Sequence, residues 1–312
     1  MQSFLLEKLY LIFYGDNEPV GLRDYRDRGD MSESDLQTAL EDLEQRGLIR
    51  VRTAGPSYQI TGLGVLYSED NQFISEDIRH NNQHARTLIL DELVRIYDEE
   101  RWFSDAHVNA LSSKLGVNLV SVIRNLRVLD DLGYVRPSGF NSYLPTELGS
   151  EAVRDFRKRQ ELVNQLERIE DLRPQTRGRE FQKLFGRVIE LYGWLRIEGL
   201  RTSHEEIDVI VHKRGDYYLV ECKWRKGRIQ SSVVRELFGK LKNRAEIRGV
   251  LVSMSGFTSG AMEQVRDFAD TRLILLFGKD DFLDILRGIK SFDELLEERR
   301  HDLIIEKKAV FK

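Results

Sequence analysis

Three residues in the second half of the chain, Asp208, Glu221 and Lys223, have the types and spacing of a site for phosphate chemistry. Two segments rich in β-branched and aromatic residues carry them, and a tight turn separates these segments. If Arg214-Gly215 is a two-residue turn, Asp208 lies directly opposite Glu221, with Cβ atoms about 5 Å apart. Lys223 is two residues beyond Glu221, so we expect all three side chains on one face of a β-hairpin.

This arrangement predicts a metal site. Two carboxylates that face each other across a sheet repel, and partial burial increases the cost. A divalent cation would reverse the interaction, and the oxygens of Asp208 and Glu221 are the hard ligands that Mg²⁺ prefers, with Mn²⁺ as a second candidate. The metal would polarise a phosphoryl oxygen, while Lys223 would orient a water or stabilise developing charge. The alternative is a purely structural ion-pair cluster on an exposed sheet face.

The surrounding segments predict an α/β domain in a chain that is α+β overall. Residues 178–192 have the apolar spacing of an amphipathic helix, which Gly193 ends. Strands are expected at 194–200, 207–211 and 217–224. Ile207, Val209, Val220 and Cys222 then point to the apolar face of the hairpin, opposite the three charged residues.

The same part of the chain resembles a known family over about residues 176–288. The motifs, in chain order, are Gly178-Arg179-Glu180-Phe181-Gln182-Lys183-Leu184, Tyr192-Gly193-Trp194, Glu206-Ile207-Asp208, Tyr218-Leu219-Val220-Glu221-Cys222-Lys223, Val234-Arg235-Glu236-Leu237-Phe238-Gly239 and the stretch Gly249–Ala261. Together they resemble the PD-(D/E)xK nuclease superfamily and, more narrowly, its Mrr-type restriction endonuclease domain.

The resemblance implies a mixed sheet with helices in the order αβββαβ plus an extra αβ. It also implies Mg²⁺-dependent DNA cleavage, with Asp208, Glu221 and Lys223 as the core triad. The family usually has a Glu on the first helix where this chain has Gln182, and Glu180 lies about 200° away around the helix. Whether Gln182 or Glu180 supports the metal, and whether one or two ions bind, stays open.

Basic residues follow the triad directly. Between 225 and 248, eight Lys and Arg face only two Glu, a net charge of +6. The prediction is a surface that binds DNA phosphates; the alternative is a solvated helix face. The residues assigned to DNA binding in this part are Arg225, Lys226, Arg228, Arg235, Lys240, Lys242 and Arg244.

Charge divides the chain into two halves. Residues 1–172 hold 20 Lys and Arg against 30 Asp and Glu, a net charge of −10, whereas residues 173–312 carry +6. The second half is therefore the better candidate for binding a polyanion. No apolar stretch reaches membrane-spanning length, Met1–Tyr14 lacks the features of a secretory signal, and Cys222 is the single cysteine. These features favour a reducing, cytoplasmic setting.

The first half is internally duplicated. Leu43–Arg50 matches Leu129–Arg136 at an offset of 86 residues, and Tyr58–Gly64 matches Tyr143–Gly149 at an offset of 85. In the first copy a helix over 32–46, capped by Ser32, precedes two short strands around a turn. Helices followed by a β-hairpin resemble a winged helix-turn-helix, which predicts modules at 1–75 and 85–156.

Two interpretations of these modules stay open. In one, the helix 118–129 of the second module enters the DNA major groove, with Arg124 and Arg127 reaching DNA. In the other, the modules are surfaces for protein docking or dimerisation, which the net charge of −10 slightly favours for the first module.

The predicted organisation continues with a helical linker at 157–175, a nuclease-like domain at 176–290 and a C-terminal helix or tail at 291–312. The leading hypothesis is a metal-dependent, Mrr-like DNA endonuclease that acts against foreign DNA. A homodimer is expected, because one site cuts one strand of a duplex. The alternatives are a catalytically inactive DNA-binding or regulatory protein that keeps the nuclease fold, and a protein-interaction scaffold.

Overall fold

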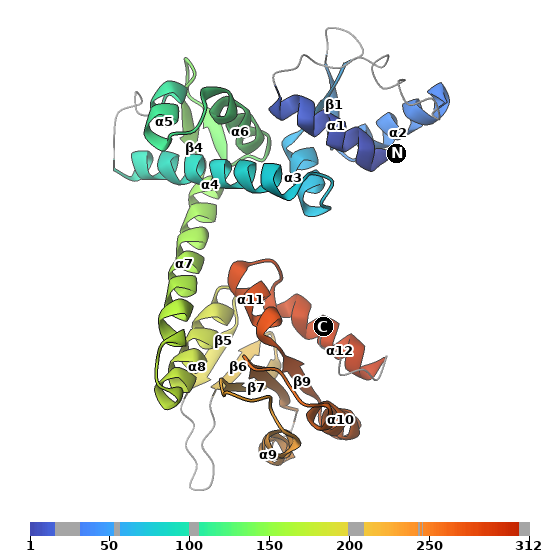
Figure 1. The fold of residues 1–312 in the computed structure, drawn as a ribbon, viewed down its shortest axis with the longest axis vertical. Coiled ribbons are helices and arrows are strands. Elements are labelled where there is room, and N and C mark those ends of the chain that lie inside the picture. Colours follow the sequence, from blue (N-terminus) through green and yellow to red (C-terminus); the bar gives the residue numbers. More distant parts are fainter. Residues whose placement is uncertain are drawn as a thin grey trace. The chain divides into compact units, whose positions relative to one another are not determined.

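The chain forms two compact units, Met1–Arg154 and Asp155–Lys312 (Figure 1). The computed structural model describes residues 1–15, 32–52, 57–99, 106–198, 209–242, 244 and 246–305. Within these ranges, no helix combines the length and apolar character needed to cross a membrane.

The first unit contains two similar runs of elements, and the second run has one helix more among the described residues. The first run consists of α1 (Gln2–Tyr14), α2 (Glu33–Gln45), β1 (Ile49–Arg52), β2 (Ser57–Ile60) and α3 (Gly62–Asp70). The second consists of α4 (Glu76–Asp98), α5 (Val108–Leu115), α6 (Leu119–Asp131), β3 (Val135–Pro137), β4 (Tyr143–Pro145) and the start of α7 (Glu147–Glu170). Both hairpins are antiparallel. The predicted cap is confirmed, because the Ser32 side chain accepts a hydrogen bond from the Asp35 amide.

Matching glycines show that the duplication extends to backbone packing. Gly64 and Gly149 each donate their amide to the threonine that precedes the helix, Thr61 or Thr146, at 3.1 Å. A Cβ added at Gly64 would lie 2.0 Å from the Leu48 carbonyl oxygen, and one at Gly149 would lie 2.1 Å from the equivalent oxygen in the second copy. Both copies therefore need glycine where the start of a helix packs against the backbone carbonyl that precedes the hairpin.

A buried polar network joins the two copies. Glu69 and Arg86 form an ion pair, and their side chains are 0% and 7% exposed. The Tyr10 hydroxyl donates to Glu69 at 2.6 Å, and Arg86 donates to the Tyr14 hydroxyl at 2.6 Å. Tyr14 in turn donates to Asn125 at 2.9 Å. Burial, with the Glu69 carboxylate beside it, raises the pKa of Tyr10, so the phenol stays protonated and acts as a donor.

Helix α6 packs against both copies. Val122, Leu126 and Leu129 lie in the core of the second copy, whereas Val128 lies in the core of the first. Asp131, at the end of α6, accepts a hydrogen bond from the Gly62 amide at 2.9 Å. One face of this helix is therefore used for packing within the unit.

The second unit is a five-stranded mixed sheet between helices. Its elements are α8 (Pro174–Glu190), β5 (Leu195–Glu198), β6 (Val209–Lys213), β7 (Asp216–Lys223), α9 (Ser231–Lys242), β8 (Arg248–Ser253), α10 (Ser259–Phe268), β9 (Ile274–Phe277), α11 (Lys279–Arg287) and α12 (Phe292–Ile304). The strand order is β5-β6-β7-β8-β9, antiparallel from β5 to β7 and parallel from β7 to β9. This succession agrees with the predicted αβββαβ order and its extra αβ.

The β6–β7 hairpin has the predicted register. Lys213 pairs with Asp216 and Val209 pairs with Val220, so the two-residue turn is Arg214-Gly215. Both turn residues have positive φ, 51° and 92°, as a type I′ turn requires.

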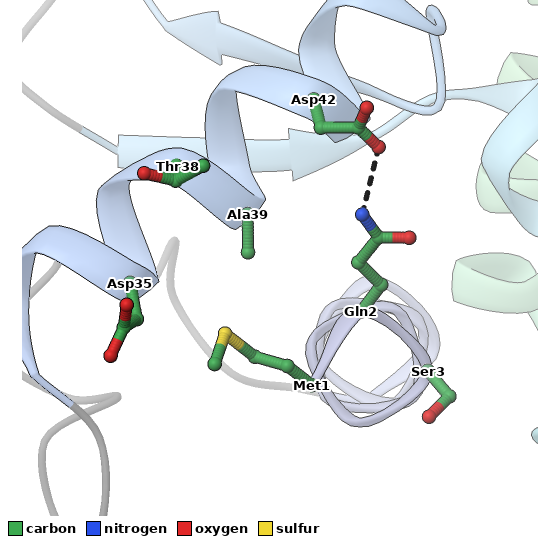
Figure 2. A pocket seen from close by; sticks show the side chains of 7 residues that line it. All are labelled: Met1, Gln2, Ser3, Asp35, Thr38, Ala39 and Asp42. Atoms are coloured by element: carbon green, nitrogen blue, oxygen red, sulfur yellow. Dashed lines mark hydrogen bonds between the residues drawn. The ribbon is translucent and has the colours of Figure 1, made fainter.

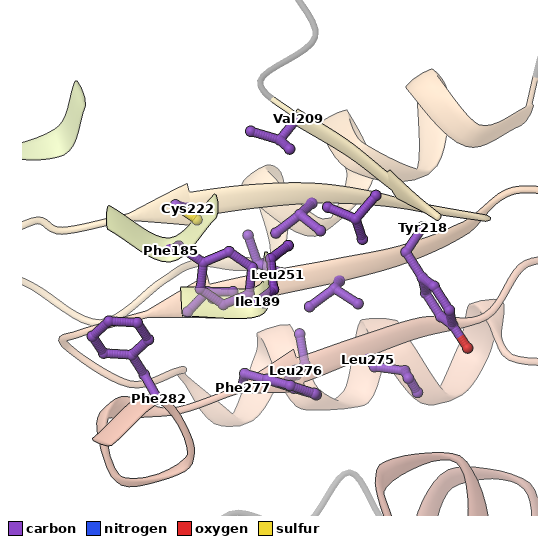
Figure 3. Close-up of a cluster of buried hydrophobic side chains, with 14 of the residues drawn as sticks. Phe185, Ile189, Val209, Tyr218, Cys222, Leu251, Leu275, Leu276, Phe277 and Phe282 are labelled. Atoms are coloured by element: carbon purple, nitrogen blue, oxygen red, sulfur yellow. The ribbon is translucent and has the colours of Figure 1, made fainter. Parts of the chain in front are cut away.

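Part of the apolar core of this unit lies on the sheet face that Tyr218 and Cys222 share (Figure 3). Phe181 and Phe185 of α8 pack against Phe282 of α11, with ring centroids 5.0 and 6.0 Å apart. Phe292 of α12 lies 5.7 Å from Phe277 of β9. The hairpin thus rests on a rigid aromatic layer.

Two stretches that the sequence assigned to connections are packed helices. α7 continues through residue 156 to Glu170, and its residues Leu162 and Ile169 lie in the core of the second unit. The helical character predicted for the linker at 157–175 agrees with α7, and this helix also contributes to the core of the second unit. Pro174, taken as a linker residue, lies in the first turn of α8, where the missing N–H of proline costs no helical hydrogen bond.

The predicted C-terminal helix or tail at 291–312 contains helix α12, which also contributes to the core. α12 buries Phe292, Leu295, Leu296 and Leu303, which are 0 to 4% exposed. Their spacing is that of one helix face, so this signal was already present in the sequence.

Replacing Gly64 or Gly149 with Ala is expected to destabilise the first unit by about 1–3 kcal/mol, because the new methyl group would overlap a carbonyl oxygen. Hydrogen exchange read by mass spectrometry on the full chain would report faster exchange in the first unit alone. Gly178→Ala is the matched control: its site is open, and a helical Ala is favoured by about 0.5–1 kcal/mol. Equal exchange in all three variants would contradict the packing.

Arg86→Met is expected to cost about 3–5 kcal/mol, because it leaves the Glu69 carboxylate buried without a counter-ion. The double variant Glu69→Leu/Arg86→Met should recover most of that loss, since neither charge remains. The measurement is the exchange rate of α1 and α4 amides in a double-mutant cycle. Additive losses would show that the two side chains do not depend on each other.

Candidate nuclease site

The candidate site is built around Glu221 of β7. Its side chain is 1% exposed, although it belongs to a residue type that is rarely buried without a partner. It alternates with Val220 and Cys222 along the strand and therefore points away from the aromatic layer. The parallel neighbour of Glu221 is Leu251 of β8. The site thus lies near the carboxyl end of β7, on the sheet face opposite α8.

Two lysines neutralise this carboxylate. The Lys223 Nζ lies 2.6 Å from Oε1 of Glu221, as expected for residues two positions apart on one strand face. The Lys240 Nζ donates to Oε2 at 3.2 Å. Their side chains are 19% and 13% exposed, so both ammonium groups sit at the rim of the buried acid.

One oxygen of Glu221 lacks a hydrogen-bond donor. Oε1 contacts Lys223 at ion-pair distance but has no hydrogen bond of acceptable geometry in the structure. A buried carboxylate oxygen without a hydrogen-bond donor is costly. A hard cation is one group that would satisfy it, and a carboxylate oxygen is the donor that Mg²⁺ prefers.

The other predicted metal ligand, Asp208, lies outside the described residues. The confirmed register stops one residue short of it, at Val209↔Val220. Among the described residues, no group of three or more His, Cys, Asp or Glu side chains is arranged to hold a metal. The structure therefore brings Glu221 and Lys223 together but does not describe the complete triad.

The predicted helix residues lie on α8. Phe181 packs on Trp224, the residue after Lys223, with ring centroids 5.4 Å apart, which puts the first half of α8 near the end of β7. Gln182 is half-buried, and no described hydrogen bond joins it to Glu221. Glu180 pairs with Lys183 at 2.8 Å on the helix surface. Neither residue is placed in the site by a direct contact.

The predicted basic surface divides into two kinds of residue. Arg225, Lys226 and Arg228, in the loop after β7, are exposed, as are Arg235 and Lys242 on α9. Lys240 and Arg244 are partly buried. Lys240 contacts Glu221, whereas Arg244 donates to the backbone carbonyl of Lys240.

The sequence pattern predicts Lys240 on the DNA surface, whereas in the structure Lys240 contacts the buried acid. The available signal was its position on the helix, three residues after the buried Leu237 and one before the buried Leu241. A residue at that position lies beside the buried face of the helix.

The two arginines predicted to reach DNA from the first unit also differ. Arg127 of α6 is exposed. Arg124 is partly buried and donates to the backbone carbonyl of Tyr14, so it helps to hold the two copies together.

Two other features carry no site chemistry. A pocket between the start of α1 and α2 is lined by Met1, Gln2, Ser3, Asp35, Thr38, Ala39 and Asp42 (Figure 2). Asp42 is already bound by Gln2 at 2.8 Å. Cys222 is buried in the apolar core, which agrees with its predicted structural role.

Comparisons with solved structures give distant similarities. FokI restriction endonuclease bound to DNA is 14% identical, with a TM-score of 0.33, over 94% of this chain and 65% of that chain. MspJI restriction endonuclease in complex with a 27-mer oligonucleotide is 18% identical, with a TM-score of 0.28, over 50% and 36%. A protein of unknown function is 16% identical, with a TM-score of 0.28, over 38% and 65%. The chain therefore spans less than two thirds of each of these proteins, and similarity at this level assigns no activity.

The match to a family of sequences is more informative. No curated protein matches the chain. Residues 174–286 match the family model of the Mrr catalytic domain, described as a restriction endonuclease. This segment runs from the first residue of α8 almost to the end of α11 and includes Glu221, Lys223 and Lys240. Residues 174–286 of this chain therefore match the family of Mrr-type restriction endonuclease domains.

Proposed function

We propose that this protein is a metal-dependent DNA endonuclease that hydrolyses phosphodiester bonds, with a role in defence against foreign DNA. The observation that carries the proposal is the fully buried Glu221 carboxylate, whose Oε1 lacks a hydrogen bond, at the end of a central strand in an Mrr-type domain. Such an acid fits a divalent cation, since the cation would replace the missing donor and offset the cost of burial.

In this proposal Glu221 and Asp208 would hold the metal, and the metal when bound would supply a Lewis acid for phosphodiester hydrolysis. Lys223, 2.6 Å from Glu221, is close enough to orient the attacking water or to stabilise charge on the phosphate. Gln182 has donor and acceptor groups with which it could bind a water at the site. Mg²⁺ is the expected ion, and Mn²⁺ is the expected substitute.

DNA binding is assigned to the exposed residues beside this site. Arg225, Lys226 and Arg228 directly follow the strand that carries Glu221, so they can position a phosphate backbone next to it. Arg235 and Lys242 of α9 are exposed and are also assigned to DNA binding, with the partly buried Arg244 after α9 as a further candidate. In the first unit, Arg127 of α6 is the exposed candidate for a DNA contact, and the partly buried Arg124 is a second candidate. Cleavage of both strands needs two sites, which favours a homodimer. The proposed modules at 1–75 and 85–156 would serve targeting or protein docking.

A second candidate function is a DNA-binding or regulatory protein without catalysis. The observation that favours it is Gln182 at the position where the family resemblance leads us to expect a Glu. Lys223 and Lys240 together also neutralise Glu221 without a metal. This candidate predicts DNA binding that falls with salt, and no cleavage with either metal.

The catalytic assignment is tested with supercoiled plasmid in Mg²⁺ or Mn²⁺, on modified and unmodified DNA. We expect nicking by wild type, abolished by EDTA and reduced at least about 100-fold in Asp208→Ala, Glu221→Gln and Lys223→Ala. Lys290→Ala is the control, because Lys290 pairs with Glu298 on α12 and should leave cleavage unchanged. Wild type that binds but never cuts would favour the second function, and equal nicking by all variants would indicate a contaminating nuclease.

The DNA surface is tested by the salt dependence of affinity. Arg225→Ala is expected to weaken binding and to lower the slope of log K against log salt by about 1, because one phosphate contact is lost. Arg214→Ala is the matched control, since Arg214 is exposed in the turn at the opposite end of β7. Fluorescence anisotropy with a labelled duplex gives both slopes. Identical slopes would remove Arg225 from the interface.

A further inference from the structure

Lys240 reaches the buried acid from a different element than Lys223. It lies near the end of α9, which packs on the same sheet face to which Glu221 points. Leu237 and Leu241 of this helix lie within 3.4 Å of a Cβ placed on Gly249 of β8. Lys242, two residues further on, is exposed, whereas only 13% of the Lys240 side chain is exposed.

The packing of α9 does not require this lysine. Val233, Val234, Leu237 and Leu241 anchor the helix, and all are between 0 and 7% exposed. Burying an ammonium group is unfavourable unless it is paired. The position of Lys240 is therefore explained by Glu221 rather than by the helix itself.

The two lysine charges around Glu221 oppose the binding of a metal cation. Among the described residues that contact it, one carboxylate faces two ammonium groups, which leaves a net positive charge. The three side chains are largely buried, so repulsion between cations is stronger there than in water. Lys240 Nζ also donates a hydrogen bond to Oε2 of Glu221 at 3.2 Å. A metal bound to this oxygen would compete with that hydrogen bond.

Lys240 also has a second acid within reach. Its Nζ lies 3.6 Å from Oε1 of Glu236, one helical turn earlier, and the Glu236 side chain is 60% exposed. The long flexible lysine stem allows the ammonium to shift toward Glu236 or toward a phosphate without moving α9.

On the basis of the proposed metal-dependent function, we propose that Lys240 is a positioning residue that serves as the internal counter-ion of Glu221. It neutralises the buried carboxylate in the metal-free protein and competes with the divalent cation for it. DNA phosphate, by attracting Lys240, then favours metal binding, so that metal and DNA strengthen each other's binding by the same factor.

The test is a titration of the full chain with Mn²⁺ in the absence of DNA. The concentration of free Mn²⁺ is measured by electron paramagnetic resonance. Lys240→Met is expected to bind Mn²⁺ about tenfold more tightly than wild type, because a competing cation is removed. Lys240→Arg keeps the charge and should stay close to wild type. Lys242→Met removes an exposed charge from the same helix and should change the affinity less than about twofold.

Lys240→Gln guards against a folding defect, since its amide can still donate to Glu221 and circular dichroism reports its fold. It should bind Mn²⁺ as tightly as Lys240→Met. Equal or weaker binding by Lys240→Met and Lys240→Gln than by wild type would overturn the counter-ion role while leaving the metal site itself intact. If these variants bind Mn²⁺ tightly while the wild type neither binds Mn²⁺ nor cuts DNA, the counter-ion role is supported and the proposed nuclease activity is contradicted. No binding by any variant would overturn both.

Discussion

The second unit depends on the burial of one negative charge. Glu221 is in the middle of the sheet order, on a strand with neighbours on both sides, and its carboxylate is closed off from solvent. An isolated ion in such a place would cost several kcal/mol, so the structure must supply compensating charge. Lys223 supplies it from the same strand and Lys240 from α9. A site that combines a buried acid with two cations has the composition needed to handle a phosphate and a metal together.

The opposite face of the sheet makes this possible. Tyr218, Val220 and Cys222 alternate with the charged residues of β7 and pack into the aromatic layer of α8, α11 and α12. Removing this apolar surface from water stabilises the strand, at roughly 25 cal/mol per Å². The other face also packs against apolar residues of α9, and Glu221 is buried there beside Lys223 and Lys240. The same alternation of side chains thus produces both the core and the candidate site.

In the first unit, a buried polar network fixes the orientation of the two copies. Two copies of one helical and hairpin unit must keep a single mutual orientation, and apolar contacts alone are weakly directional. The ion pair of Glu69 with Arg86, extended by Tyr10, Tyr14 and Asn125, accepts only one arrangement of donors and acceptors. Arg124 reinforces this joint through the Tyr14 carbonyl. Arg124 was predicted to reach DNA, whereas in the structure it links the two copies through this contact.

The sequence by itself determined whatever depends on neighbours along the chain. The Arg214-Gly215 turn sets the register of the hairpin. The common face of Glu221 and Lys223 follows from the alternation of side chains along one strand. The repeat was visible in the sequence partly because Gly64 and Gly149 are both required where a Cβ would overlap a backbone carbonyl oxygen. Tertiary structure decided what depends on separate elements. Lys240 meets Glu221 only because α9 folds back onto β7, and residues 157–170 join a core only because their apolar face finds the second unit. Local patterns fix which face of an element is apolar or charged, but the partner of that face is chosen by packing over the whole chain.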